Sequence, residues 1–264
     1  MTLTLVVLLG LALGSFINAL VWRLHEDKDF VASRSECVHC HHQLSARDLV
    51  PVFSWIMLQG KCRYCHEPIS IQYPIVEILT AISFGASYLF WPEHLTNALD
   101  VSLFISWLIQ IVILMSLFVY DLKWYLLPNK LTYALIAVAF AEQIINTTTI
   151  SVLLLNTFIG VLVGSGLFYL IFMTTKGKGI GGGDVKLGVY LGLALGWQHA
   201  LIALLVAFYS ATLFSLPLIL MRKVNRKSKI PFGPFIILGI VIAKLFGKTL
   251  FSWLAAITGM GYYL

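Results

Sequence analysis

Two aspartates and four cysteines are the residues whose types and positions predict chemistry in this chain. Asp121 directly follows a long apolar run, and Asp184 lies at the end of the glycine-rich stretch GKGIGGGDVK, residues 177–186. All four cysteines lie between residues 37 and 65, in two pairs with C-x2-C spacing. Carboxylates can act as general acids and bases, and four thiolates can hold one zinc ion.

The two aspartates are expected at the same edge of a membrane, where ionisable groups are costly and indicate function. Two carboxyl groups brought close together do not both ionise readily, so one keeps a proton near neutral pH. One group can then activate water while the other polarises a carbonyl. Asp121 and Asp184 therefore form a candidate aspartic protease pair that titrates as a unit.

Three alternatives compete with catalysis. Asp184 could be the N-cap of the following helix, and Asp121 could be an interfacial charge solvated beside Lys123. The pair could also form a proton or cation site in a transporter. Such sites usually lie near the bilayer midplane and in repeated halves, whereas both acids here are expected at one edge and no internal repeat is evident.

The glycines beside Asp184 favour a loop that admits another chain. GKGIGG fits the pattern G-x-G-x-x-G, but a dinucleotide site requires a preceding strand, and an apolar span precedes this stretch. Glycine allows close approach of a second backbone. We therefore expect a loop that receives an extended substrate segment next to Asp184. Its residues are Gly181, Gly182, Gly183 and Lys186.

The cysteine pairs are Cys37-Val-His-Cys40 and Cys62-Arg-Tyr-Cys65, separated by 21 residues. Four thiolates at this spacing predict a closed, structural zinc site that stabilises a segment too small for its own core. Disulfides are disfavoured because the loop is predicted to be cytoplasmic, and a redox pair is disfavoured because no βαβ pattern surrounds it. The nearby histidines could replace a cysteine as ligand, but we expect them to be solvated loop residues. They are His39, His41, His42 and His66.

The composition defines the fold class. Hydrophobic residues make up 59% of the 264 residues, charged residues 11%, and mean hydropathy is +0.89. A soluble domain carries about 25% charged residues. The chain is therefore predicted to be an all-α, polytopic membrane protein with about eight transmembrane helices and a small cytoplasmic zinc loop. The spans are expected near residues 3–22, 72–91, 100–120, 131–146, 151–173, 185–197, 199–221 and 232–256.

The basic residues predict the topology. Sixteen of the 18 Lys and Arg residues lie in segments 23–71, 121–130, 174–186 and 222–231. This bias assigns those segments to the cytoplasm and both termini to the outside. The first apolar run lacks a basic start and is longer than a signal peptide requires, so we interpret it as a span. The net charge of +6 is then a topology signal and argues against a nucleic-acid partner.

The order of several motifs resembles the type IV prepilin peptidases, a branch of the GxGD intramembrane aspartic proteases. The match covers nearly the whole chain. The motifs are Gly14-Ser15-Phe16-Ile17-Asn18, Trp22-Arg23-Leu24, the double C-x2-C loop, Tyr73-Pro74-Ile75-Val76-Glu77, Asp121-Leu122, Leu127-Pro128-Asn129 and Gly181-Gly182-Gly183-Asp184.

The resemblance implies both activity and location. Members cleave the basic leader of prepilins and pseudopilins at the cytoplasmic face of the bacterial inner membrane, and many then methylate the new N-terminus with S-adenosylmethionine. The family aspartates correspond to Asp121 and Asp184, and the resemblance associates methyl transfer with Gly60, with Glu77 as a further candidate. Residues 1–71 would then form the methyltransferase-associated region with the zinc loop, and residues 72–264 the peptidase domain.

Overall fold

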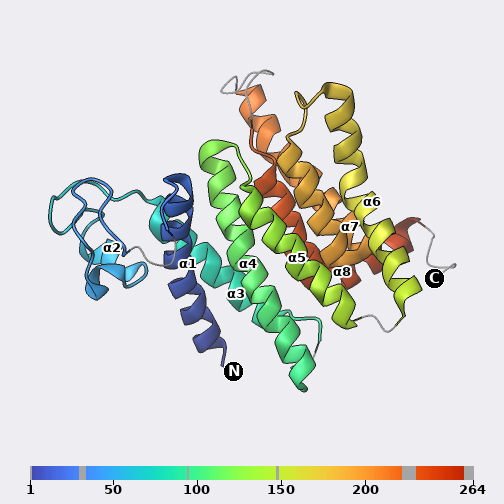
Figure 1. Ribbon diagram of the computed structural model, residues 1–264, viewed down its shortest axis with the longest axis horizontal. Coiled ribbons are helices and arrows are strands. Elements are labelled where there is room, and N and C mark those ends of the chain that lie inside the picture. Colours follow the sequence, from blue (N-terminus) through green and yellow to red (C-terminus); the bar gives the residue numbers. More distant parts are fainter. Residues whose placement is uncertain (1, 30–33, 94, 147–148, 222–229, 259–264) are drawn as a thin grey trace. The chain divides into compact units, whose positions relative to one another are not determined.

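A computed structural model describes residues 2–29, 34–93, 95–146, 149–221 and 230–258. These residues form eight α-helices, one 3-10 helix and two isolated β-bridges, without an extended strand (Figure 1). The elements are α1 (Leu3–His25), η1 (Ala46–Leu49), α2 (Phe53–Met57), α3 (Gln72–Leu89), α4 (Ala98–Trp124), α5 (Asn129–Asn146), α6 (Ile150–Thr175), α7 (Gly182–Leu220) and α8 (Gly233–Thr258).

The long helices coincide with the predicted spans and confirm an all-α membrane protein. Five of them, α1, α4, α6, α7 and α8, are long and apolar enough to cross a membrane. Helices α3 and α5 match the predicted spans 72–91 and 131–146, but each has only 18 residues and includes polar side chains. Most of the last basic segment, residues 222–229, lies outside the described residues.

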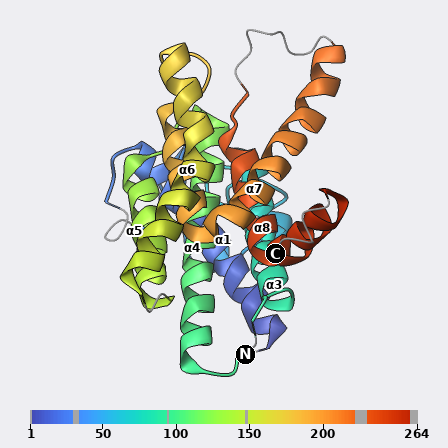
Figure 2. The same ribbon diagram turned by 90° about the vertical axis from the view of Figure 1, so that its right-hand side faces the viewer.

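Helix α7 accounts for two predicted spans because it breaks at Gly196. This residue has φ 69° and ψ 171°, in a region that side chains other than glycine rarely adopt. The expected boundary between spans 185–197 and 199–221 therefore falls within two residues of the break. Figure 2 shows the later part of α7 leading away from α6.

The chain forms two compact units, residues 1–119 and 120–264, with the boundary inside α4. In the first unit, α1 and α3 pack antiparallel along a line of close contacts. A Cβ atom on Gly10 would lie 2.7 Å from the Ala81 Cα atom, and one on Gly14 would lie 2.6 Å from the Glu77 Cα atom. Near the start of α3, the Asn18 side chain donates a hydrogen bond to the Tyr73 carbonyl at 3.1 Å.

In the second unit, glycines hold α6 and α7 in direct backbone contact. A Cβ atom on Gly164 would lie 2.5 Å from the Gly188 carbonyl oxygen, and Gly160 and Gly192 face each other even more closely. This is the small-residue packing of membrane helices. Gly166 differs from its two neighbours, because its Cβ position faces Leu162 of its own helix. The contact fixes the start of α7, and so the position of Asp184, against α6.

Candidate active site and thiolate cluster

Asp121 lies in the last turn of α4, so the helix continues past the apolar run that was expected to end at residue 120. Its side chain is buried, with 6% of the residue exposed. The Gly233 N–H, at the start of α8, donates a hydrogen bond to Asp121 Oδ2 at 3.1 Å. The alternative that Asp121 is a solvated charge beside Lys123 is therefore wrong, because its carboxyl group is covered by the protein.

Gly233 is a site residue that sequence reasoning missed. A Cβ atom at this position would lie 2.5 Å from Asp121 Oδ2, so only glycine lets the backbone approach the carboxyl group this closely. The preceding Phe232 packs against Phe168 and Phe208, with ring centroids 5.8 and 5.4 Å apart. The available signal was a glycine within Pro-Phe-Gly-Pro-Phe, residues 231–235, directly before the last span.

Asp184 is the third residue of α7, and its carboxyl group turns back to the helix start. Asp184 Oδ2 accepts a hydrogen bond from the Gly181 N–H at 3.3 Å. The capping alternative is thus partly realised, although Gly181 and not Asp184 occupies the N-cap position. Asp184 also interacts electrostatically with Asp121, so the structure brings the two carboxyl groups together from α4 and α7.

The rest of the glycine stretch is tied to the segment between α4 and α5. A Cβ atom on Gly183 would lie 3.0 Å from Leu127 Cβ, which explains a glycine at that position. Lys186 Nζ donates a hydrogen bond to Asn129 Oδ1 at 2.6 Å and lies 5.3 Å from the Tyr133 ring centroid. No comparable crowding surrounds Gly182, whose Cβ position has only ordinary contacts.

The four cysteines form one cluster in the first unit. Their sulfur atoms all lie within 4.8 Å of one another, and the Cys37 and Cys65 sulfurs are 3.9 Å apart. Tetrahedral zinc with bonds of about 2.3 Å needs sulfur separations of about 3.8 Å, so the cluster fits a metal ion. Among the described residues, no histidine belongs to this cluster.

The two cysteine pairs have the same local structure. In the first, the Cys37 N–H donates to the His42 carbonyl at 3.0 Å, and the His41 N–H donates to the Cys37 carbonyl at 2.9 Å. In the second, the Cys62 and His66 N–H groups make the equivalent bonds at 2.8 and 3.0 Å. His41 and His66 both have positive φ, 54° and 61°, so these histidines turn the backbone.

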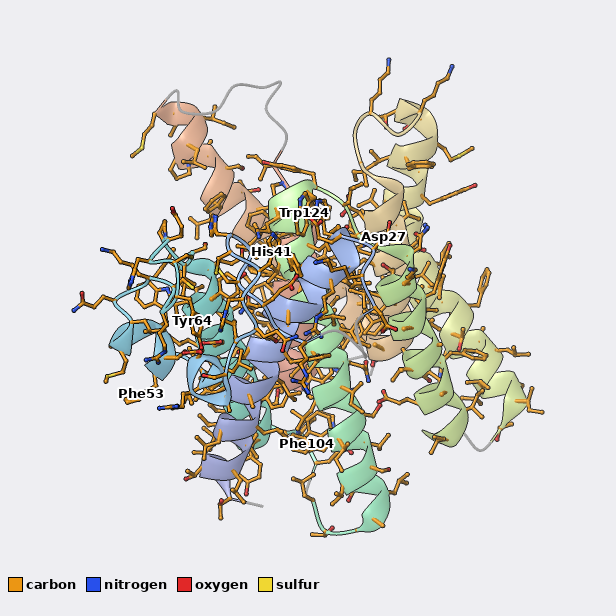
Figure 3. The ribbon with its side chains drawn as sticks, turned by 60° about the vertical axis from the view of Figure 1, so that its left-hand side comes forward. Asp27, His41, Phe53, Tyr64, Phe104 and Trp124 are labelled. Atoms are coloured by element: carbon orange, nitrogen blue, oxygen red, sulfur yellow. The ribbon has the colours of Figure 1, made fainter. Side chains whose placement is uncertain are left out.

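Asp48 connects η1 to the second cysteine pair. Its carboxylate accepts hydrogen bonds from Ser45 Oγ at 2.7 Å, Arg63 Nε at 2.7 Å and the Tyr64 hydroxyl at 3.2 Å. Burial acts to raise the pKa of Asp48, but the hydrogen bonds from Arg63 and Ser45 outweigh it and lower this pKa to about 2. Figure 3 labels His41, which directly follows the first cysteine pair, and Tyr64, which lies within the second.

Residues 52–60, which include α2, are held at one end by Glu77 of α3 and end at Gly60. Glu77 is buried, and its Oε2 accepts a hydrogen bond from the Val52 N–H at 2.7 Å. Val52 has φ 60°, a strained value for a β-branched residue, so this bond fixes an unusual turn. Gly60 has φ 69°, and a Cβ atom there would lie 3.0 Å from the Trp55 ring.

The fold and the two sites together define a class: a polytopic helical membrane protein with a carboxyl pair in one unit and a four-thiolate cluster in the other. Comparisons with known proteins agree with this class. Residues 8–91 match the bacterial peptidase A24 N-terminal domain, and residues 108–216 match the type IV leader peptidase family.

Several named relatives match almost from end to end. The "Prepilin leader peptidase/N-methyltransferase" of Aeromonas hydrophila is 31% identical, over 95% of this chain and 92% of the relative. The Bacillus subtilis (strain 168) protein of the same name is 27% identical, over 95% and 97%. An Escherichia coli O78:H11 protein, named "Type 4 prepilin-like proteins leader peptide-processing enzyme", is 32% identical, over 92% and 93%.

The chain belongs to the type IV leader peptidase family, as the order of its motifs predicted. No solved structure shows a significant match to it.

Proposed function

We propose that this chain is a membrane aspartic endopeptidase that cleaves the leader of prepilins or pseudopilins and then methylates the new N-terminus. The observation that carries the proposal is that Asp121 and Asp184, from α4 and α7, lie close enough to interact electrostatically in a member of the leader peptidase family. The printed names of the relatives, which combine leader peptidase and N-methyltransferase, support the two activities.

The carboxyl pair performs the cleavage. One carboxylate takes a proton from water as the water oxygen attacks the scissile carbonyl, and the protonated partner hydrogen-bonds to the carbonyl oxygen. The tetrahedral intermediate then collapses, the C–N bond breaks and the departing amine receives a proton from the pair. Gly233 holds the Asp121 side chain through its N–H, and Gly181 holds that of Asp184. The loop at Gly181, Gly182, Gly183 and Lys186 receives the extended substrate beside Asp184.

We place the cleavage site at the cytoplasmic face of the bacterial inner membrane. The bias of Lys and Arg toward segments 23–71, 121–130, 174–186 and 222–231 supports this orientation. A prepilin carries a basic leader before a long apolar helix, so the helix remains in the bilayer and presents its leader at that face. Lipid and prepilin are the partners, and no nucleic acid takes part.

Conservative substitutions test the pair. Asp121→Asn and Asp184→Asn are each expected to lower leader cleavage by about 10²–10⁴-fold or more, because each removes a proton-transfer group. Asp100→Asn is the matched control, since Asp100 lies in the first turn of α4, about 31 Å from Asp121 along the helix. Purified, membrane-inserted variants are incubated with a prepilin and the products are weighed by mass spectrometry. Normal cleavage by either Asp121→Asn or Asp184→Asn excludes the proposed pair.

We assign methyl transfer to the N-terminal region, with residues 1–71 supplying the zinc loop and residues 72–264 the peptidase domain. S-adenosylmethionine, when bound, would supply the methyl group to the new N-terminal amine. Glu77 and Gly60 position this region by fixing the two ends of the α2 segment, through Val52 and Trp55. Their role is therefore to hold the loop in its active shape.

The mass of the mature product tests this assignment. With S-adenosylmethionine present, the cleaved prepilin is expected to gain one CH2 group at its new N-terminus. Gly60→Ala is expected to lower this gain by about tenfold without changing cleavage, because a side chain at φ 69° strains the turn against Trp55. If the unaltered protein cleaves the prepilin but adds no CH2 group, the protein is a peptidase alone and the assignment of methyl transfer is wrong.

We propose zinc as the ion of the four-thiolate cluster. Cys37, Cys40, Cys62 and Cys65 are a closed ligand set, which suits a structural ion without an open coordination position. When bound, zinc supplies folding free energy to the loop. Elemental analysis of the purified protein is expected to give one zinc per chain, and a chain that holds its loop structure without any metal contradicts the assignment.

A further inference from the structure

The segment from Leu49 to Met57 exposes an apolar surface on the zinc loop. Phe53, Ile56 and Met57 are 61%, 59% and 65% exposed, and Leu49 and Val50 are 39% and 44% exposed. Residues 49–60, LVPVFSWIMLQG, contain no charged side chain. A helix face at i, i+3 and i+4 that is this apolar needs a nonpolar neighbour.

The depth of this segment follows from its hydrogen bond to α3. Val52 is bound to Glu77, which packs directly on Gly14 of α1. Gly14 precedes Arg23, the first charged residue of the chain, by nine residues, or about 13 Å along a helix. Allowing one helical turn, about 5.4 Å, for the glutamate side chain, Val52 still lies about 8 Å toward the membrane interior from Arg23.

The figures agree with this depth. Figure 3 shows Phe53 on the opposite side of the view from Asp27, which follows the end of α1. Figure 1 shows α2 at the same level along α1. The apolar surface therefore lies beside a membrane-spanning helix and away from the charged end of the loop.

The backbone of the segment is suited to a lipid environment, because many of its N–H groups bond within the protein. Val52 donates to Glu77, and Pro51 has no N–H group. The N–H groups of Ser54, Ile56 and Leu58 donate to the carbonyls of Val50, Val52 and Ser54 at 3.0, 3.1 and 3.0 Å. Further bonds run from Gln59 to Ile56 and from Gly60 to Trp55.

The outward face of α3, in the same unit, is apolar as well. Ile71, Ile75, Ile78 and Ile82 are 55%, 46%, 42% and 59% exposed along that helix. Helix α3 packs on α1, a membrane-capable helix, so this isoleucine face borders lipid.

We infer that residues 49–57 insert into the lipid leaflet and seat the zinc loop against the acyl chains. The occupant of the surface is the nonpolar boundary of the bilayer. The two cysteine pairs then lie outside the leaflet, while Phe53, Ile56 and Met57 enter it as an interfacial anchor.

Photocrosslinking in a bilayer tests the insertion. Benzoylphenylalanine is placed singly at residues 53, 57, 64 and 82 of the full chain, in nanodiscs of phosphatidylethanolamine and phosphatidylglycerol. Tyr64, which is 40% exposed and lies within the second cysteine pair, is the aqueous control, and Ile82 is the lipid control. Residues 53 and 57 are expected to give at least about tenfold more lipid adduct than residue 64, and a yield close to that of residue 82.

Adducts from residues 53 and 57 to residues 120–264, to a second copy or to a prepilin overturn the inference, as does a yield equal to that at residue 64. A measurement on the unaltered protein guards against a misfolded variant. Oxidation of Met57 by hydrogen peroxide is expected to be about tenfold slower in nanodiscs than in the same protein unfolded in denaturant. Equal rates in the two states contradict insertion.

Discussion

The thiolate cluster and the carboxyl pair are built in opposite ways. Each cysteine pair closes its own turn, with hydrogen bonds that span five residues, as from Cys37 to His42. The carboxyl site instead joins α4, α7 and α8, and the bond from Gly233 to Asp121 spans 112 residues. Local sequence therefore determines the first site, whereas the packing of distant helices determines the second. Substitutions at the two sites should therefore differ in the size of their effects and in which property they change.

The largest effect on stability is expected at the thiolate cluster. Structural zinc binding contributes about 10–16 kcal/mol near neutral pH, so Cys37→Ser, which removes one of four thiolates, should cost roughly 3 kcal/mol. The variant should lose zinc and the ordered loop, measured by metal content and by proteolysis of residues 34–70. His39→Ala is the matched control, because His39 lies in the same loop and outside the cluster. Equal zinc loss in the two variants contradicts the assignment of ligands.

The next effect is expected at Gly233. Gly233→Ala introduces a Cβ atom 2.5 Å from Asp121 Oδ2, so the carboxyl group or the start of α8 must move. Cleavage should fall by about 10²-fold, since misplacement of a reacting group by about 1 Å has that effect. Gly166→Ala is the control, because its Cβ meets only an ordinary 3.5 Å contact with Leu162. A Gly233→Ala protein that cleaves prepilin normally removes Gly233 from the site.

A smaller effect is expected at Glu77, where two substitutions distinguish a positioning role from a chemical one. Glu77→Ala leaves the Val52 N–H without its acceptor and should cost about 1–3 kcal/mol in stability, with methylation falling about tenfold. Glu77→Gln retains an acceptor oxygen and should keep most of the methylation. The readout is the CH2 gain on cleaved prepilin. If Glu77→Gln abolishes methylation in a fully folded protein, Glu77 acts in the chemistry and not in positioning.

The smallest effect is expected at Asp48. Asp48→Asn weakens the bonds from Arg63 and Ser45 and should destabilise the loop by about 1 kcal/mol. Because the folded pKa of about 2 lies below the ordinary 3.8, this stability is complete above pH 4 or so and is lost only as pH falls toward 2. The difference in zinc retention between Asp48→Asn and the unaltered protein should therefore stay constant from about pH 7 to about pH 5. A difference that disappears in this range contradicts the ionised state of Asp48.

The sequence predicted what depends on short-range pattern. Cysteine spacing predicted a four-thiolate cluster, and apolar runs predicted the helices, including a division of residues 185–221 that the structure places at Gly196. The small residues Gly160 and Gly164, four apart in one apolar run, are typical of a close helix contact, and they lie at one. Each of these features follows from residue type and position along a single element.

The rest required tertiary packing. Nothing in the local pattern near residue 121 indicates that the helix continues through Asp121 to Trp124, or that Gly233 meets it from α8. The short helix α2 also escaped prediction, since residues 53–57 lie within a segment assigned to a loop. Its position depends on tertiary contacts, such as the hydrogen bond from Val52 to the buried Glu77, 25 residues apart in the chain, and the bond from the Trp55 indole to the Ile69 carbonyl.

The central claim is that Asp121 and Asp184 act as one catalytic unit, and a double-mutant cycle tests it most directly. Leader cleavage is measured for Asp121→Asn, Asp184→Asn and the double variant, each purified and inserted in nanodiscs. Residues that act as a unit are strongly non-additive, so the double variant should be no slower than the slower single variant. Residual rates that multiply, with the double variant slower than either by the product of the single effects, would show two independent groups and contradict the account.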